Sequence, residues 1–285
     1  LGIQQTKISS LMIIIMSILN IVFSSILVLS YNLDVLGVAL GTLFASFITV
    51  IVFTLYTYRF IIKKFKLIPR FEKLLIKSKL LKLFNINSNI FVRTLILTFS
   101  FLWITYLSSK LGEDYLAVNT ILMQFIILAA FFLDAYAFST EGVIGFTIGR
   151  KNKNSFLSIV KNSIQISFIT ALILSFVYII FFKQIINTIT DIELLRFISY
   201  KHFLWVIVIP PIASFCYQLD GIFIGASQTR EMRNAMIFSV LSFIIISIYL
   251  TKYFGNHGLW FSLVCFMVFR SLTLKFYFNK ILRKF

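Results

Sequence analysis

Long apolar runs, separated by short polar and basic segments, dominate the sequence. A helix needs about 20 apolar residues to cross the hydrocarbon layer of a membrane, and eight runs reach or approach that length. They lack the apolar–polar alternation of a membrane-spanning β-strand. The pattern therefore predicts about eight transmembrane helices, at approximately Ile8 to Leu29, Leu36 to Phe60, Ile90 to Ser109, Tyr115 to Phe138, Phe156 to Phe182, Phe197 to Gly225, Ala235 to Leu250 and Leu259 to Phe278.

Prolines and glycines are expected to shape these helices. Pro210 and Pro211 lie inside the sixth run, where they remove hydrogen bonds of the helix ladder and favour a kink. The kink is either a hinge or a device of packing. Glycines four residues apart let helices approach closely, and such pairs occur as Gly37 and Gly41, Gly145 and Gly149, and Gly221 and Gly225.

Composition supports a membrane protein. Hydrophobic residues make up 59% of the chain, charged residues 13%, and the mean hydropathy is +0.95, so water cannot solvate most of the sequence. A net charge of +17 would suggest a nucleic-acid partner for a soluble protein. Here the bases lie mainly between apolar runs, where they contact anionic headgroups. We therefore expect the lipid bilayer as a partner, and no nucleic acid.

Enzymatic, redox and metal chemistry find no support in the sequence. Cys216 and Cys265 lie within apolar runs, and His202 and His257 have no candidate co-ligands near them, so neither a disulfide framework nor a metal site is predicted. The sequence has no nucleophile triad and no phosphate-binding glycine loop. We predict that the chain is not an enzyme, uses no cofactor, and takes transport energy from an ion gradient or a separate partner.

The distribution of Lys and Arg predicts an orientation, because cytoplasmic loops carry an excess of these residues. One set of loops is rich in them, around Lys7, Lys63 to Lys82, Arg150, Arg230 and Lys275. The opposite loops hold only Lys110, Lys183, Arg196, Lys201 and Lys252. Both ends of this chain are therefore expected in the cytoplasm.

Residues 61–89 form the longest basic segment. After Pro69, the apolar residues Phe71, Leu74, Leu75 and Leu81 recur at near-helical spacing among lysines. This pattern is typical of an amphipathic helix in the inner headgroup region, although a calmodulin-type or nucleic-acid-binding helix shares it. We interpret residues 61–89 as a cytoplasmic amphipathic linker between two lobes, residues 1–60 and 90–285.

An internal repeat relates the start of the chain to its end. Leu1-Gly2-Ile3-Gln4-Gln5-Thr6-Lys7 matches Ile224-Gly225-Ala226-Ser227-Gln228-Thr229-Arg230, with Gly, Gln and Thr identical, at a period of about 222 residues. Six predicted helices follow the linker, and the repeat lies between the fourth and fifth of them. Only two helices precede the linker. We therefore expect four N-terminal helices of the same parent chain to be missing, so that the chain is a C-terminal fragment or the product of a truncated reading frame.

Three acids lie within apolar runs or at their inner ends: Asp134 in FFLDAYAF, Glu141 in STEGVIG and Asp220 in YQLDGIF. A carboxylate in hydrocarbon is costly, so such residues commonly face a bundle interior and bind a proton or cation. The alternative, an acid satisfied by neighbouring hydroxyls or bases, stays open for all three. At about 1.5 Å per residue, Asp134 lies about 24 Å from Arg150, and Asp220 about 15 Å from Arg230. Asp134 is therefore the deeper candidate for coupling.

Other polar residues interrupt the apolar runs. Arg93 and Arg270 lie toward the inner ends of their runs, and we predict that both snorkel to the headgroups. Uncharged residues are candidates for the lining of a solute path, or else for hydrogen bonding between packed helices: Asn119, Gln124, Tyr136 and Tyr217.

Longer motifs occur in a fixed order along the chain. They are NIFVRT from Asn89, LAVNTILMQF from Leu116, FFLDAYAFSTEGVIGFTIG from Phe131, DGIFIGASQTREMRNAM from Asp220 and GNHGLW from Gly255. In these motifs the chain resembles the MATE family of multidrug and toxin extrusion transporters, and within it the DinF-type bacterial branch.

The resemblance implies an all-α polytopic membrane protein of the bacterial inner membrane, with twelve helices in two pseudo-symmetric six-helix lobes. Residues 1–60 would be the last two helices of the N-lobe, and residues 90–285 the complete C-lobe. The implied function is secondary antiport, by alternating access, of small organic compounds, drug-like or toxic, in exchange for H⁺ or Na⁺. Alternatives are a lipid-linked-sugar flippase of the same superfamily and a non-transporting membrane remnant.

The resemblance also bears on the acids. Asp134 and Asp220 match acids of the family's C-lobe pattern. The acid most often linked to coupling in DinF-like members lies on the first N-lobe helix, which this chain lacks. We therefore expect that the chain does not transport alone.

Overall fold

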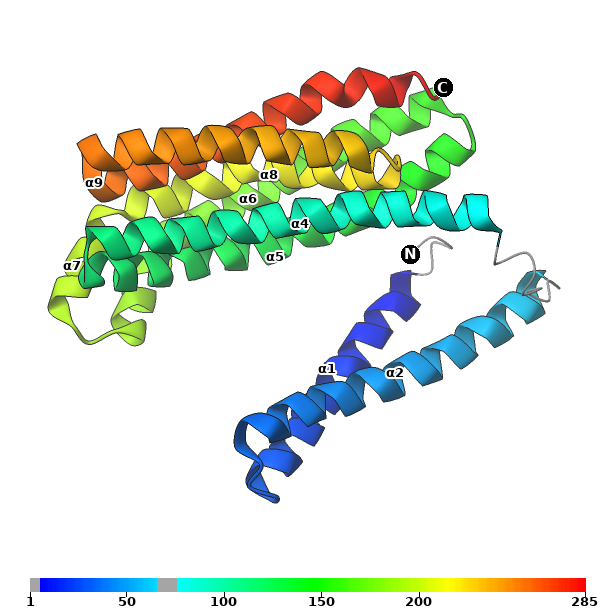
Figure 1. The fold of residues 1–285 in the computed structure, drawn as a ribbon, viewed down its shortest axis with the longest axis horizontal. Helices are drawn as coiled ribbons and strands as arrows, with labels where there is room; N and C mark the ends of the chain where they lie inside the picture. Colours follow the sequence, from blue (N-terminus) through cyan, green and yellow to red (C-terminus); the bar gives the residue numbers. More distant parts are fainter. Residues whose placement is uncertain (1–5, 66–75) are drawn as a thin grey trace. The chain divides into compact units, whose positions relative to one another are not determined.

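The computed structural model describes residues 6–65 and 76–285. These ranges contain eight helices (Figure 1): α1 (Thr6–Leu29), α2 (Asp34–Phe65), α4 (Lys77–Leu111), α5 (Glu113–Gly149), α6 (Lys153–Ile189), α7 (Glu193–Lys201), α8 (Phe203–Gly225) and α9 (Thr229–Leu282). All of them except the short α7 are long and apolar enough to span a membrane. The predicted all-α polytopic membrane fold is confirmed.

The chain divides into two compact units, Leu1–Leu81 and Lys82–Phe285. In the first unit, α1 and α2 form a hairpin. A Cβ on Gly41 would lie 2.6 Å from the backbone nitrogen of Ser24, so only glycine permits this approach, and the packing role predicted for Gly41 is confirmed. Asn20 Nδ2 donates a hydrogen bond to Thr42 Oγ1 (3.0 Å) and links the two helices further.

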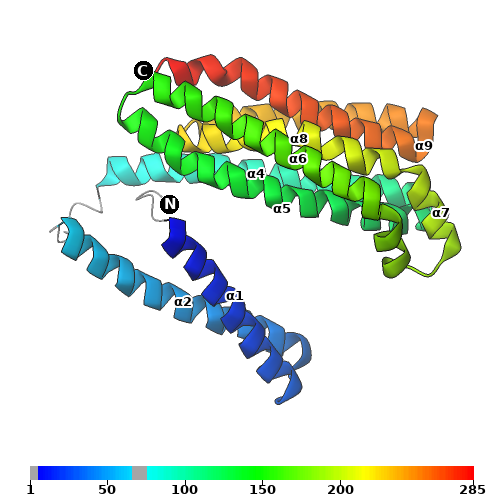
Figure 2. The same ribbon diagram turned by 180° about the vertical axis from the view of Figure 1, so that it is seen from behind.

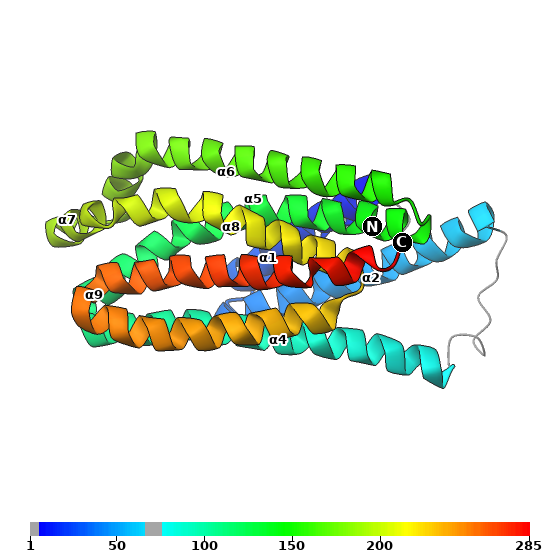
Figure 3. The ribbon, with the colours of Figure 1, turned by 90° about the horizontal axis from the view of Figure 1, so that it is seen from above.

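The second unit is a helical bundle built around α8. This helix packs against α5, α6 and α9, and it is surrounded by them in the view of Figure 3. Seen from behind (Figure 2), α5 and α6 run along the bundle, and α7 lies at the end opposite the C-terminus. Buried side chains from all these helices form the core, among them Leu122, Tyr178, Ile209, Phe243 and Phe266.

The last two predicted helices are confirmed as the two arms of α9, which a kink at Gly255 (φ 57°, ψ −136°) separates. One predicted boundary is wrong. The sixth predicted helix begins too early, because Phe197 belongs to α7 and the spanning helix α8 starts at Phe203. The break lies at His202, whose backbone N–H bonds to the carbonyl of Ser199 (3.1 Å). Arg196 instead separates α6 from α7, since its guanidinium donates to the carbonyls of Thr190 (2.7 Å) and Asn187 (3.0 Å).

The predicted linker is helical in part. α2 continues to Phe65 and α4 begins at Lys77, so the residues after Lys77 belong to the same helix as the following span rather than to a separate segment. Phe71, Leu74 and Leu75 lie outside the described residues.

Pro210 and Pro211 lie inside α8, which continues through both of them. Pro211 has no N–H, so the carbonyl of Ile207, four residues earlier, loses its ladder partner. The hydroxyl of Ser175 on α6 donates to that carbonyl at 2.7 Å. The lost bond is thus replaced by a contact between helices, which favours packing over a hinge as the role of this proline.

A histidine pair joins the start of α8 to the turn of α9. The His202 and His257 rings stack with centroids 4.3 Å apart. His202 is 3% exposed, and its Nδ1 lies 2.8 Å from the carbonyl of Ile198. Burial is the largest cause that lowers the pKa of His202; His257 and Lys201 lower it further, and the bond to Ile198 opposes them.

Acid is therefore expected to destabilise this end of the bundle. Because the pKa of His202 is lower in the folded state than its ordinary value of 6.5, the unfolded state binds more protons, and stability declines as pH falls below 6.5. Thermal unfolding in detergent at about pH 8 and about pH 5.5 measures the effect. His202→Asn, which keeps a donor for Ile198, should show a smaller decline. An equal decline in both proteins would assign the acid sensitivity to other groups.

Candidate functional site

The candidate site is built where α5 and α8 approach most closely. A Cβ on Gly221 would lie 2.4 Å from the carbonyl oxygen of Ala137, and one on Gly225 would lie 2.4 Å from that of Glu141. Both glycines face α5 one helical turn apart, so they bring the two backbones together. The predicted packing role of this glycine pair is confirmed. Asp220, next to Gly221, is thereby fixed in the interior of the bundle.

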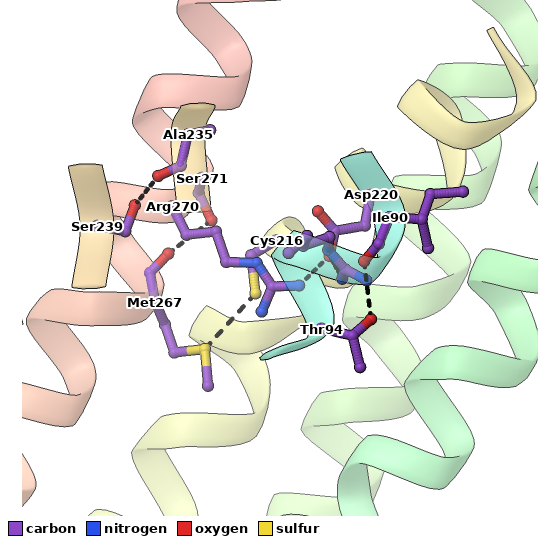
Figure 4. A network of polar contacts seen from close by, with 10 residues as sticks. Ile90, Thr94, Cys216, Asp220, Ala235, Ser239, Met267, Arg270 and Ser271 are labelled. Carbon is purple, nitrogen blue, oxygen red and sulfur yellow. Dashed lines mark hydrogen bonds and ion pairs between the residues drawn. The ribbon is translucent and has the colours of Figure 1, made fainter. Parts of the chain in front are cut away.

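Asp220 pairs with two arginines from different helices. Its Oδ2 accepts from the Nη2 atoms of both Arg93 on α4 and Arg270 on α9. Figure 4 shows the carboxylate between these helices, with the thiol of Cys216 donating to the sulfur of Met267 (3.6 Å) close by. Tyr217 adds a ring whose centroid lies 5.7 Å from the Arg270 guanidinium. One acid therefore joins α4, α8 and α9.

The predicted snorkelling of Arg93 and Arg270 is wrong. The side chains of Arg270 and Asp220 are 2% and 6% exposed, and that of Arg93 is 15% exposed. A buried guanidinium is stable only when an acid compensates its charge, and Asp220 supplies that charge. Of the two interpretations of Asp220, its contacts therefore support the second, in which the acid is paired with neighbouring bases.

Asp134 lies on α5 beside this cluster. Its carboxylate is partly buried and within electrostatic range of Arg270, Asp220 and Arg93. Two guanidinium groups face only one carboxylate at Asp220, so the cluster carries one excess positive charge. An ionised Asp134 balances that charge and a protonated Asp134 does not. The charge state of Asp134 is therefore tied to the arginines.

Glu141 lies two turns along α5 from Asp134, toward Gly149, and it is partly buried. Its backbone carbonyl contacts Gly225, whereas its side chain makes no contact with the Asp220 cluster among the described residues. The structure thus brings Asp134 and Asp220 together and leaves Glu141 apart.

Asn119 sits in a buried polar network. It exchanges hydrogen bonds with Asn256 in both directions (2.7 and 3.0 Å), donates to Ser108 (2.8 Å) and accepts from the indole of Trp260 (2.9 Å). α4, α5 and α9 are joined by these bonds. Asn119 is thus fully hydrogen-bonded between packed helices.

A pocket of about 160 Å³ opens beside this network, between α4 and α5. Asn119 and Gln124 both lie on its wall, together with the hydroxyls of Thr105, Ser108 and Thr120. Tyr136 lies elsewhere on α5, where its hydroxyl accepts from Thr170 (3.1 Å). Two of the four predicted cavity-lining residues therefore line one pocket, and Tyr136 and Tyr217 contact other helices.

Among the described residues, no three His, Cys, Asp or Glu side chains are grouped closely enough to hold a metal ion. The buried polar groups of the candidate site are those of arginine, carboxylate, amide and hydroxyl side chains. Carboxylates bind protons and simple cations, and amides and hydroxyls bind hydrogen-bonding solutes.

Buried charges inside a bundle of spanning helices are common in membrane transporters, and comparison with known sequences specifies the family of this chain. A sequence model of the MatE family matches residues 90–251. The chain belongs to the MatE family, whose members are transporters. The resemblance seen in its motifs is confirmed.

Two curated relatives agree. The chain is 31% identical to DNA damage-inducible protein F of Escherichia coli over 96% of its own length and 59% of that protein. It is 24% identical to Protein DETOXIFICATION 43 of Arabidopsis thaliana over 95% of its length and 50% of that protein. The chain thus spans between half and three fifths of the length of these relatives.

Solved structures show the same fold. A variant of the Vibrio cholerae MATE transporter VcmN matches with a TM-score of 0.87 at 16% identity, over 99% of this chain and 64% of that one. An outward-facing multidrug resistance MATE family transporter of the MOP superfamily matches with a TM-score of 0.84 at 18% identity, over 96% and 62%. The helices of this chain therefore have the fold of the matching part of these MATE transporter structures.

Proposed function

We propose that this chain belongs to a secondary antiporter of the bacterial inner membrane that exports small organic compounds in exchange for H⁺ or Na⁺. Membership of the MatE family supports transport. The single observation that supports ion coupling is the position of Asp134, a partly buried acid within electrostatic range of the Asp220 cluster. The orientation with both ends of this chain in the cytoplasm rests on the distribution of Lys and Arg.

The charge balance suggests how coupling works. With Asp134 ionised, two acids face two arginines. When Asp134 takes up a proton, or a cation binds to it, the cluster gains a positive charge that the interior tolerates poorly. That cost changes the balance between two arrangements of the helices around the site, as alternating access requires.

Polar groups on α4 and α5 suit an organic solute. The pocket beside Asn119 and Gln124 has hydroxyl, amide and apolar walls, which combine hydrogen bonding with apolar contact as in other small-molecule sites. A flippase of lipid-linked sugars would instead call for dense bases along the solute path. This pocket favours the drug exporter.

Asp134→Asn tests the proposed coupling. The complete transporter that carries this chain is expressed in a strain lacking its major efflux pumps, and efflux of a fluorescent cationic dye is followed across pH, with and without Na⁺. The variant should lose its dependence on pH and Na⁺ together with most of its efflux, about 100-fold or more, because the residue that binds the coupling ion is gone. Asp114→Asn, an exposed acid in the first turn of the same helix, is the matched control and should behave like wild type.

Two results would count against the proposal. Unchanged efflux and ion dependence in Asp134→Asn would remove Asp134 from the coupling site. No ion-dependent efflux by the wild-type transporter, despite normal expression, would remove antiport itself.

A further inference from the structure

A second site lies at the end of the bundle that carries α7, away from the Asp220 cluster. A pocket of about 180 Å³ is lined there by Ile179, Ile180, Phe182 and Phe203, with Lys183 and Tyr200 at its rim. The rings of Phe182 and Phe203 pack against each other in its lining, with centroids 4.6 Å apart. The pocket therefore combines an apolar trough with one cation.

Lys183 is held at the rim and keeps its charge uncompensated. Its Nζ lies 5.8 Å from the centre of the Tyr200 ring, and the Tyr200 hydroxyl is itself fixed by donating to Asn187 Oδ1 (2.7 Å). Asp191, the nearest acid in sequence, pairs instead with Arg196 (3.1 Å). Among the described residues no acid forms an ion pair with Lys183, so its ammonium group is available to an anion.

The helices set the depth of these groups in the membrane. α7 is a short helix that follows the end of α6, and it exposes Leu194 (50%) and Phe197 (57%) beside Lys201. Apolar and basic residues side by side on a short helix are typical of the membrane interface. Lys183 lies within two turns of the end of α6, and Ile179 one further turn, about 6 Å, toward the membrane centre. The ammonium group of Lys183 thus lies at the depth of the lipid headgroups, and the apolar part of the pocket lies closer to the membrane centre.

We propose that this pocket binds the phosphate and the upper part of one acyl chain of an anionic phospholipid from the leaflet at the α7 end. The order of groups matches that of a lipid, with charge at the surface and hydrocarbon deeper. Ile179 and Ile180 are about half exposed in the structure, and a bound chain would cover them.

Phosphatidylglycerol is the probe, with phosphatidylcholine as the zwitterionic comparison. Its apparent dissociation constant is measured by native mass spectrometry of the purified chain in a neutral detergent. Lys183→Gln should weaken phosphatidylglycerol binding about fivefold, the loss expected for one basic residue near a membrane surface. Lys110→Gln is the matched control, because Lys110 also lies over a tyrosine ring, that of Tyr106 (4.7 Å), outside the pocket. It should bind as the wild type does.

A second pair of variants tests the trough without changing charge. Ile180→Trp fills the pocket and should also weaken phosphatidylglycerol binding, whereas Ile173→Trp, an exposed position on the same helix outside the pocket, should not. Three results would each overturn the proposal. Phosphatidylcholine could bind as tightly as phosphatidylglycerol, or Lys183→Gln could keep wild-type affinity for phosphatidylglycerol, or glycerol phosphate could compete as strongly as the lipid does. The last result would indicate a site for free phosphate. None of these measurements depends on transport.

Discussion

Replacing Asp220 with asparagine is expected to destabilise the protein by about 3–5 kcal/mol, because it leaves two guanidinium groups in the bundle interior without a counter-charge. The loss of the counter-charge costs most at Arg270, because its side chain is 2% exposed and cannot reach water unless α9 unpacks. The effect is measured as the free energy of unfolding in mixed micelles, followed by tryptophan fluorescence. Efflux should be lost as well, since Asp134 would then face both arginines alone.

Asp191→Asn is the matched control for charge chemistry. Asp191 also pairs with an arginine, Arg196 (3.1 Å), but its side chain is fully exposed, and exposed ion pairs contribute little. The control should have the free energy of unfolding of the wild type. If Asp220→Asn and Asp191→Asn have the same free energy of unfolding, Asp220 is not a buried counter-ion.

A double variant separates charge from packing. Removing the orphaned base in Asp220→Asn with Arg270→Met should recover part of the lost stability, because a buried pair replaced as a whole costs much less than a pair that is broken. Arg93, which is 15% exposed, can then turn toward solvent. No recovery would mean that the destabilisation arises from altered packing around α8.

The spanning helices could be predicted because each is encoded locally, by a run of apolar residues long enough for a membrane. The one wrong boundary falls where this signal fails. Phe197 and Phe203 are equally apolar, and α7 is separated from α8 at His202, whose backbone N–H bonds to the carbonyl of Ser199, a local arrangement that no run length reveals. The turn of α9 could be predicted, because one apolar run ends before Gly255 and the next begins after it.

The ion-pair partners could not be predicted in the same way. Arg93 and Asp220 are 127 positions apart, and Arg270 and Asp220 are 50 apart, so their meeting depends on how three helices pack. The prediction of snorkelling treated each helix alone. One signal was available: Arg93, Arg270, Asp134 and Asp220 all lie within apolar runs, and charges in hydrocarbon are stable only when paired. Counting them together would have suggested a cluster that includes Asp134.

Gly221→Ala should be the second most damaging change. The added methyl group would lie 2.4 Å from the Ala137 carbonyl oxygen and 2.9 Å from the carbon atoms beside it. These are backbone atoms that cannot rotate away, so α5 and α8 must separate. Overpacking of this kind costs about 1–3 kcal/mol, and separation would also move Asp134 on α5 away from Asp220 on α8. Reduced stability in micelles and reduced ion-dependent efflux are therefore expected together.

Gly145→Ala is the control for the alanine itself. Gly145 lies on α5 at the same interface, but a Cβ there would meet its nearest atom, the Gly225 carbonyl oxygen, at an ordinary 3.5 Å. Alanine favours helix over glycine by up to about 1 kcal/mol, so this variant should be as stable as wild type or slightly more so. Because both substitutions add one methyl group to the same pair of helices, their difference measures the close approach alone. Equal free energies of unfolding of the two variants would show that α5 and α8 can move apart without loss of stability. The position of Asp220 would then not depend on the contact between these helices.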